Sequence, residues 1–340
     1  MKKLLNTLYV STQGMYLHRE GETVVAEHDR EVKLRLPIHT LSGIVCFGNV
    51  MCSPFLLGLC SERGVHVSLL TERGRFLARV SGPVSGNVLL RREQHRACDD
   101  AARSCGIARN IVTAKILNSR AILQRRLRDH GTDHATLHAV TMMADVASRL
   151  QKAGDVNEVR GLEGEAANLY FGVFDSLIVS QKSDFAFQTR SRRPPLDPVN
   201  TLISFLYTLL AHDCVGALEA VGLDPQMGFL HALRPGRPSL ALDLMEEFRA
   251  ILADRVALSL INLNQVNGRG FTTSESGAVT MKDDTRKQVL MAWQQKKQEE
   301  VLHPFIQEKV ALGLLPYVQS QLLARHLRGD MDAYPPYLLK

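Results

Sequence analysis

The first 88 residues carry the hydrophobic pattern of a β-rich unit. Short runs with β-branched residues or period-two alternation predict strands, and glycines spaced along the segment mark the turns between them. One segment with a helical pattern, 51–63, is expected to pack on the sheet. The predicted strands cover 7–10, 23–26, 32–36 and 65–70.

The segment 82–87 contains glycine, proline and serine and is predicted to be a linker, and beyond it the pattern changes to that of helices. The stretch 94–128 is rich in helix-forming Ala, Leu, Arg and Gln, and a small hairpin is expected over 271–281. The predicted fold class is therefore α+β, with a small N-terminal β-rich domain (1–88) followed by a large all-α domain (89–340). Further helices are predicted at 135–152, 158–179, 199–221, 239–261, 283–312 and 315–328.

Hydrophobic residues make up 45% of the chain and charged residues 22%, which provides enough apolar material for a sizeable core. No apolar run approaches the roughly 18 residues that span a bilayer. Polar residues also interrupt the basic N-terminus before a signal-peptide core develops. We therefore expect no membrane contact and a cytoplasmic location. The six cysteines form no Cys-x-x-Cys pair and are expected to be buried free thiols.

The positive charge is concentrated in one stretch. The chain has a net charge of +6, and the segment 91–130 alone contains ten Lys and Arg and four Asp and Glu, so ten minus four equals the whole surplus. A cation cluster of this kind is typical of a protein that binds a phosphate backbone. The alternative is a solvated helix face.

Glu163 is the first candidate for a chemical role. On a helix it shares one face with apolar side chains, and a buried carboxylate is costly unless it is paired or bound to a metal. The alternative is a solvated glutamate in a first helical turn, where the helix dipole favours it. The residues that share this face are Ala166, Ala167, Tyr170 and Phe174.

A second carboxylate group lies on the predicted helix 239–261. Its acidic residues gather on one side of that helix, opposite an apolar stripe, and like charges at this spacing repel one another. A bound cation would relieve the repulsion, although Arg249 and Arg255 offer an alternative source of positive charge. The acidic residues are Asp243, Glu246, Glu247 and Asp254.

His231 stands twelve residues before Asp243, between an apolar triplet and a loop that carries Arg234 and Arg237. The two prolines and the glycine of this loop restrict its conformation, so the arginines are candidates for holding a phosphate beside a metal. One imidazole combined with carboxylates suits Mg²⁺ or Mn²⁺ better than a structural zinc site.

Two other metal sites are weaker alternatives. His130, His134 and His138 are spaced by four residues, but Gly131 is expected to break the helix between the first two. The pair His212–Asp213 is similar to that of metal-dependent phosphohydrolases, yet a two-residue match is common by chance.

Three separated motifs, at 160–164, 228–231 and 240–249, resemble the signature of the CRISPR-associated spacer integrases, the Cas1 family. The similarity runs across essentially the whole chain. The stretch 236–240 and the ending Tyr334-Pro335-Pro336-Tyr337 resemble the subtype I-C branch of that family.

This resemblance implies a metal-dependent DNA endonuclease and integrase, which inserts short foreign DNA fragments into a CRISPR array by 3′-hydroxyl attack on phosphodiesters. The implied ligands of Mg²⁺ or Mn²⁺ are Glu163, His231 and Glu246, with Asp243 as a supporting carboxylate. The implied substrates are double-stranded DNA and branched DNA intermediates. The implied assembly is a homodimer formed by the N-terminal domain, with two dimers bridged by the companion protein Cas2 in a heterohexamer-like complex.

Contacts to DNA are expected from Arg234 and Arg237 as phosphate clamps, and from Lys115 and Tyr207 near the site. The main alternative function belongs to another class of protein. It is a metal-independent DNA-binding scaffold that uses the basic stretch 91–130 and in which the acidic cluster is structural.

The segment 330–340 follows the last predicted helix, and Pro335-Pro336 cannot continue a helix. Its two tyrosines and two leucines are costly to expose but too few to form a core. An extended proline-containing segment loses little entropy on docking, so we expect it to attach the companion protein. The alternative is that it folds back on its own domain.

Overall fold

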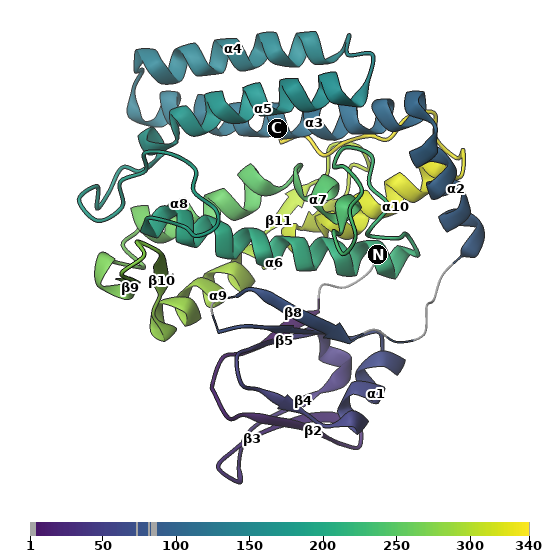
Figure 1. Ribbon diagram of the computed structural model, residues 1–340, viewed down its shortest axis with the longest axis vertical. Coiled ribbons are helices and arrows are strands. Elements are labelled where there is room, and N and C mark those ends of the chain that lie inside the picture. The colour runs from purple at the N-terminus through teal and green to yellow at the C-terminus, as the bar shows by residue number, and fades with distance from the viewer. Residues whose placement is uncertain (1–4, 73, 81, 83–86, 340) are drawn as a thin grey trace.

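The structure, a computed structural model, describes residues 5–72, 74–80, 82 and 87–339. It has the predicted α+β organisation, in which a β-rich N-terminal region is followed by a helical region (Figure 1). The last strand of the β-rich region ends at Val80, and the first long helix begins at Val88. Residues 83–86, which form most of the predicted linker, lie outside the described residues.

Within the described residues, the β-rich region contains two four-stranded sheets. In the first, with the order β1-β5-β7-β8, three parallel strands are joined by the antiparallel β8 at the edge. The second has the order β4-β3-β2-β6. The strands are β1 Asn6–Val10, β2 Tyr16–Glu20, β3 Thr23–His28, β4 Glu31–Pro37, β5 Leu41–Phe47, β6 Met51–Cys52, β7 His66–Leu70 and β8 Phe76–Val80.

A short helix, α1 (Pro54–Glu62), contacts strands of both sheets. It begins at Pro54 because the Ser53 side chain accepts a hydrogen bond from the Leu56 N–H and proline suits the first helical position. The predicted helix 51–63 was therefore too long at its start, where β6 lies. A small hydrophobic core fills the space between the elements, with Leu17 and Ile44 completely buried.

β5 is a central strand that the sequence pattern does not predict, because Gly43 is typical of a turn. A Cβ atom at Gly43 would lie 3.3 Å from the His66 carbonyl oxygen of the neighbouring strand. The glycine therefore permits the close approach of β7 and does not mark a turn.

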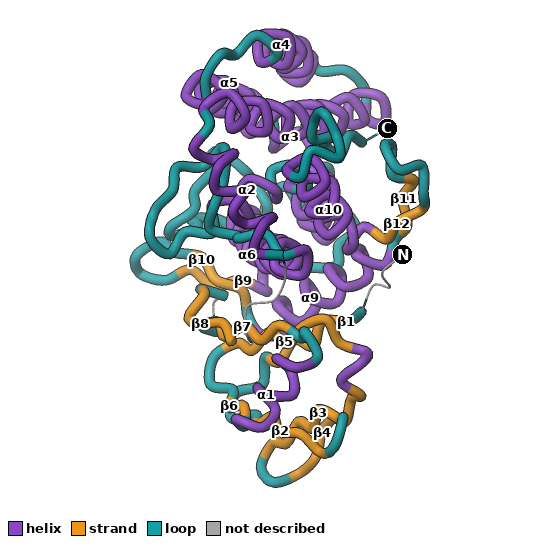
Figure 2. The backbone as a smooth tube through the Cα atoms, turned by 90° about the vertical axis from the view of Figure 1, so that its right-hand side faces the viewer, coloured by secondary structure: helices purple, strands orange, loops and turns teal. Residues whose placement is uncertain are grey.

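In the helical region, α3, α4 and α5 pack against one another in one layer, and α6 lies beneath them (Figure 1). In Figure 2, the view turned by 90°, α4 again lies at one end of the molecule and the strands β2, β3 and β4 lie at the opposite end. The helices are α2 Val88–Asp99, α3 Ala101–His130, α4 His134–Leu150, α5 Val156–Gly172, α6 Pro198–Val221, α7 Ser239–Met245, α8 Arg255–Asn262, α9 Asp283–Gln298 and α10 Leu315–Leu327.

Two predicted helices are interrupted. The predicted helix 239–261 stops at Met245 and continues as a π-helical segment, Arg249–Asp254, before α8. The predicted helix 283–312 ends at Gln298 and is followed by a second short hairpin. The hairpin expected over 271–281 is confirmed. The hairpin strands are β9 Phe271–Thr273, β10 Val279–Met281, β11 Glu300–Leu302 and β12 Lys309–Ala311.

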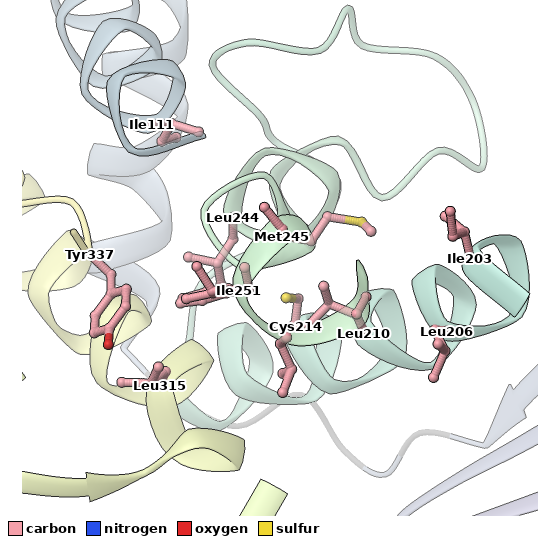
Figure 3. Packing of buried hydrophobic residues seen from close by; sticks show 14 of the residues in the cluster. Ile111, Ile203, Leu206, Leu210, Cys214, Leu244, Met245, Ile251, Leu315 and Tyr337 are labelled. Carbon is pink, nitrogen blue, oxygen red and sulfur yellow. The ribbon is translucent and has the colours of Figure 1, made fainter. Parts of the chain in front are cut away.

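α6 corrects the expectation that the chain contains no long apolar run. By length and composition alone this helix is long and apolar enough to cross a membrane. It is instead a core helix, because it packs against α10, α7 and α8 and its apolar side chains belong to the main core. Figure 3 shows Leu206, Leu210 and Cys214 of α6 in this cluster.

The C-terminal segment also differs from its main prediction, because it folds back into the helical region. Tyr334 and Tyr337 are 1% and 2% exposed, and Figure 3 shows Tyr337 beside Leu315 of α10. The Tyr334 hydroxyl and the Tyr337 N–H both donate to the buried carboxylate of Glu247. Burial of two aromatic side chains, with their polar groups satisfied, outweighs the entropy cost of ordering the segment. The segment is therefore part of this fold.

Deletion of residues 330–340 is expected to destabilise the protein strongly. Removal of a buried aromatic side chain costs about 3–5 kcal/mol, so the loss of two lowers the melting temperature by roughly 10 °C or more. The exposed variant Asp332→Ala serves as the control and should melt as the wild type does. A truncated protein with an unchanged melting temperature in calorimetry would contradict this placement of the segment.

Candidate functional site

Segments that are far apart in the sequence meet on one side of α3. This helix contacts α5, α7 and the π-helical segment. Lys115 lies on α3, Glu163 on α5 and Glu246 directly after α7. Arg160 of α5 connects this helix to the loop before α7, because its Nε donates to the Leu230 carbonyl oxygen at 2.5 Å. The same loop carries His231.

Asp243 organises that loop from within the core. Its carboxylate is 0% exposed and accepts the backbone N–H groups of Phe229, Leu230 and His231 at 2.6, 2.9 and 2.9 Å. A Cβ atom at Gly228 would lie 2.7 Å from Asp243 Oδ2, so only glycine leaves room for this approach. Asp243 therefore supports the site from behind.

His231 is oriented by the same carboxylate. Its Nδ1 lies 2.6 Å from Asp243 Oδ1. Because a carboxylate oxygen accepts hydrogen bonds, Nδ1 carries a proton in this contact, and in the neutral form of the ring the lone pair is on Nε2. Nε2 faces Glu246, with 3.9 Å to Oε1. A histidine fixed in this way by a carboxylate behind it is the usual arrangement of a metal ligand.

Glu246 is a buried carboxylate surrounded by positive groups. Arg249 Nη2 lies 2.9 Å from its Oε1, and Lys115 Nζ lies 2.8 Å from its Oε2. Burial alone raises the pKa of this carboxyl, but Arg249, Lys115 and His231 together lower it to about 2. Glu246 is therefore ionised at neutral pH.

Glu163 joins the cluster through Lys115. The Lys115 ammonium contacts Glu163 Oε1 as well as Glu246 Oε2. Because both oxygens contact one nitrogen atom, they lie within about two hydrogen-bond lengths of each other. The structure thus places Glu163 and Glu246 on either side of Lys115, with His231 beside Glu246.

The donor set of this cluster fits a hard divalent cation. Two carboxylates and one imidazole suit Mg²⁺ or Mn²⁺. Glu246 Oε2 is buried and has its ion pair with Lys115 but no well-aligned hydrogen bond. Among the described residues, however, no three His, Cys, Asp or Glu side chains are arranged to hold a metal as they stand. Lys115 would have to move for a cation to contact both carboxylates.

The four acidic residues expected to share one cation have separate partners instead. All four are buried, but Asp243 lies within α7, whereas Glu246, Glu247 and Asp254 lie beyond its end at Met245. Glu247 contacts the C-terminal segment, and burial raises its pKa to about 7. Asp254 accepts the hydroxyls of Tyr170 and Tyr207 at 3.1 and 2.9 Å. Asp243 and Glu246 both face His231, and of the four only Glu246 shares the Lys115 ammonium with Glu163.

Tyr207, predicted to position DNA, belongs to a network beside the cluster. Its hydroxyl donates to Asp254, and the guanidinium groups of Arg249 and Arg190 lie over its ring at 4.8 and 5.5 Å. The Asp254 carboxyl has its pKa raised by burial to about 6. A small cavity of about 20 Å³ separates this network from Lys115. Tyr207 therefore borders the site without an exposed hydroxyl.

Arg192 and Arg193 are candidate DNA contacts that sequence reasoning missed. Both are exposed and line a groove of about 670 Å³ between the β-rich and helical regions, together with Arg75 and Phe76. Arg192 also lines the small cavity beside Lys115, so the groove leads towards the cluster. The run Arg190-Ser191-Arg192-Arg193 was the available signal.

The arginines that were predicted to bind DNA fall into two groups. Arg234 is exposed and Arg237 half-buried on the loop after His231, so both remain candidates. Within the basic stretch 91–130, several arginines have structural roles. Arg120 and Arg126 donate to the carbonyl oxygens of Val140 and Ser176. Two that remain exposed to solvent are Arg125 and Arg128.

The weaker metal sites find no support either, because the described side chains include no group of three arranged to hold a metal. Asp213 pairs with Lys297 at 2.9 Å, and His212 packs against the ring of Phe76. The histidines 130, 134 and 138 are exposed around the turn between α3 and α4.

The fold and the cluster define a class of protein, in which a β-rich N-terminal region precedes a helical region with a carboxylate–histidine site. A model of the family described as CRISPR associated protein Cas1 matches residues 8–295. The chain belongs to this family.

The curated relative "CRISPR-associated endonuclease Cas1 1" of Chlorobaculum tepidum is 56% identical over 341 residues, which cover 99% of both proteins. Two solved structures share the fold at lower identity. A casposase bound to an integration product is 22% identical, with a TM-score of 0.84 over 97% of this chain and 93% of that one. A Cas6-RT-Cas1–Cas2 complex is 21% identical, with a TM-score of 0.84 over 100% of this chain and 37% of that one.

We predict that Asp243→Asn unfolds at a lower denaturant concentration than the wild type. An asparagine offers one acceptor oxygen to the four donors that Asp243 satisfies, and each buried group left unpaired costs roughly 1–3 kcal/mol. Asp184→Asn, which weakens one exposed bond to the Gly268 N–H, is the matched control. Equal stability of Asp243→Asn and wild type in urea titrations would show that this carboxylate does not hold the loop.

Proposed function

We propose that the protein is a divalent-metal-dependent DNA endonuclease and integrase that inserts short DNA fragments into a CRISPR array. The observation that carries this proposal is that three separate segments bring Glu163 and Glu246 onto the Lys115 ammonium, with His231 beside Glu246. Membership in the Cas1 family supports it, as do an endonuclease among the relatives and the similar fold of a casposase bound to an integration product.

Glu163, His231 and Glu246 would hold Mg²⁺ or Mn²⁺. When bound, such an ion neutralises the negative charge that builds up on the scissile phosphate. Asp243 keeps the His231 lone pair directed at Glu246 and fixes the loop backbone. Arg249 neutralises the remaining charge of Glu246 and limits how far this carboxylate can turn.

The proposed reaction is a transesterification. A 3′-hydroxyl oxygen of the incoming fragment forms a bond to the phosphorus as the bond to the array strand's leaving oxygen breaks. The attacking hydroxyl loses its proton to solvent, and the leaving oxygen takes one up. One phosphodiester replaces another, so the reaction needs no external energy source. Attack by water at the same position gives cleavage instead.

We assign DNA binding to cations around the site. Arg234 and Arg237 are proposed phosphate clamps on the His231 loop, and Arg192 and Arg193 extend the positive charge into the groove. Lys115 and Tyr207 border the cavity that opens beside the carboxylates. The substrates would be double-stranded DNA and branched DNA, in the cytoplasm.

The proposed assembly is the one that membership in the Cas1 family implies. The structurally similar chain in the Cas6-RT-Cas1–Cas2 complex supports Cas2 as a companion protein, in a heterohexamer-like complex with two dimers of this chain. Subtype I-C stays a proposal that rests on the residues 236–240 and 334–337.

The second candidate function is that of a scaffold that binds DNA without a metal. Lys115 favours it, because this lysine already neutralises Glu163 and Glu246.

Substitution of a proposed ligand separates these two functions. We predict that Glu163→Gln and His231→Ala reduce Mn²⁺-dependent joining of branched or supercoiled DNA by about 100-fold or more, because the loss of a ligand weakens the metal site. DNA affinity should change little, because Lys and Arg provide it through counterion release.

Glu165→Gln, on the same helix and paired with Arg149 at the surface, is the matched control and should stay active. The double variant Arg125→Glu/Arg128→Glu tests the binding surface and should bind DNA more weakly than the wild type. Ligand variants that lose DNA affinity as severely as activity, or that keep full activity, would refute the assignment.

The proposed homodimer has a candidate surface on the β-rich region. Tyr16 and Met51 are neighbours on β2 and β6, and Phe55 follows on α1; they are 37%, 58% and 78% exposed. Such an apolar patch favours association. Light scattering on the wild type should give twice the mass of one chain. Phe55→Asp should shift the protein to the monomer. The control Leu302→Asp, at an exposed apolar position on β11, should leave the dimer unchanged. A monomeric wild type at micromolar concentration would contradict the proposal.

A further inference from the structure

Lys115 occupies an unusual position for a lysine. Its side chain is only 12% exposed, and its ammonium contacts Glu163 and lies 2.8 Å from Glu246 Oε2. These are the two carboxylates proposed as metal ligands. Because Lys115 lies within the long helix α3, its backbone is fixed, and only the side chain can leave this position.

The positive charge of Lys115 stabilises the two carboxylates electrostatically. Two carboxylates so close together repel each other, and Glu246 is almost completely buried. A buried carboxylate stays ionised only when cations compensate for its lost hydration. Arg249 contacts one oxygen of Glu246, whereas Lys115 contacts the other and also reaches Glu163. Lys115 is therefore the cation that the two carboxylates share.

A divalent ion and this ammonium cannot occupy the site together. Carboxylate oxygens bind Mg²⁺ or Mn²⁺ at about 2.0–2.3 Å, and the ammonium lies within hydrogen-bond distance of the same oxygens. Both cations would fill nearly the same space and repel each other strongly.

A cavity beside Lys115 offers its ammonium a second position, away from the two carboxylates. The small cavity beside it, about 20 Å³ in volume, is lined by Ser119 and by Asp254, whose charge faces those of Arg192 and Arg249 in the same lining. This volume holds roughly one water-sized group, which is also the size of an ammonium. The flexible four-carbon stem of lysine allows the movement.

We propose that Lys115 is the resident cation of the site, and that a divalent ion binds by displacing its ammonium from Glu163 and Glu246. The inference rests on the proposed metal-dependent function. It has a consequence for DNA. A phosphate near the cavity offers the displaced ammonium a new partner, so DNA and metal promote each other's binding by the same factor.

The test measures Mn²⁺ binding to the DNA-free protein by electron paramagnetic resonance, independently of activity. Lys115→Gln and Lys115→Met, which remove the competing cation, should bind Mn²⁺ about tenfold more tightly than the wild type. Lys115→Arg keeps the charge and should bind no more tightly. Lys182→Gln, which removes a lysine paired with Asp175 elsewhere on the surface, is the matched control and should match the wild type. If Lys115→Gln or Lys115→Met is destabilised without metal, Mn²⁺ should restore its melting temperature.

The outcomes distinguish this inference from the proposed function. Glu163→Gln should bind Mn²⁺ more weakly, and an unchanged affinity of that variant would overturn the proposed metal site itself. Weaker binding by Glu163→Gln together with unchanged or weaker binding by Lys115→Gln and Lys115→Met would leave the metal site intact and overturn the role of Lys115. Failure of Mn²⁺ to restore destabilised Lys115 variants would overturn it as well.

Discussion

The arrangement of the helical region depends on the neutralisation of Glu246. Burying this carboxylate without partners would cost several kcal/mol, so cations must reach it from neighbouring elements. Lys115 comes from α3 and Arg249 from the π-helical segment, and both contact the carboxylate. The ion pairs therefore tie the positions of these two elements to each other. Glu163 of α5 contacts the same ammonium. The ion pairs therefore connect α5 to α3 and the π-helical segment as well.

Two other acidic side chains hold the chain on either side of Glu246. Asp243, one turn earlier, binds the backbone of the His231 loop. Glu247, the next residue, binds the C-terminal segment through Tyr334 and Tyr337. A regular helix cannot direct these side chains to such different partners, and the interruption after α7 allows it. Irregular helical segments of this kind are frequent at functional sites.

Much of this organisation could be predicted from the sequence. The α+β fold class and the hairpin 271–281 followed from local patterns, and the motifs around Glu163, His231 and Glu246 identified residues that do converge. The partner of Glu247 at the interruption of the helix 239–261 was not predictable, because it lies in a segment about 90 residues away. For the same reason the C-terminal segment was assigned to a partner. Lys115 was expected near DNA, and only the packing of α3 against α5 and α7 shows it between the carboxylates.

Anomalous diffraction from crystals grown with Mn²⁺ tests the central claim most directly, namely that Glu163, His231 and Glu246 form a divalent-cation site. The predicted result is one anomalous peak at about 2.0–2.3 Å from an oxygen of each glutamate and from His231 Nε2, with the Lys115 ammonium withdrawn from both carboxylates. A site without such a peak, with Lys115 still between Glu163 and Glu246 at millimolar Mn²⁺, would contradict the claim.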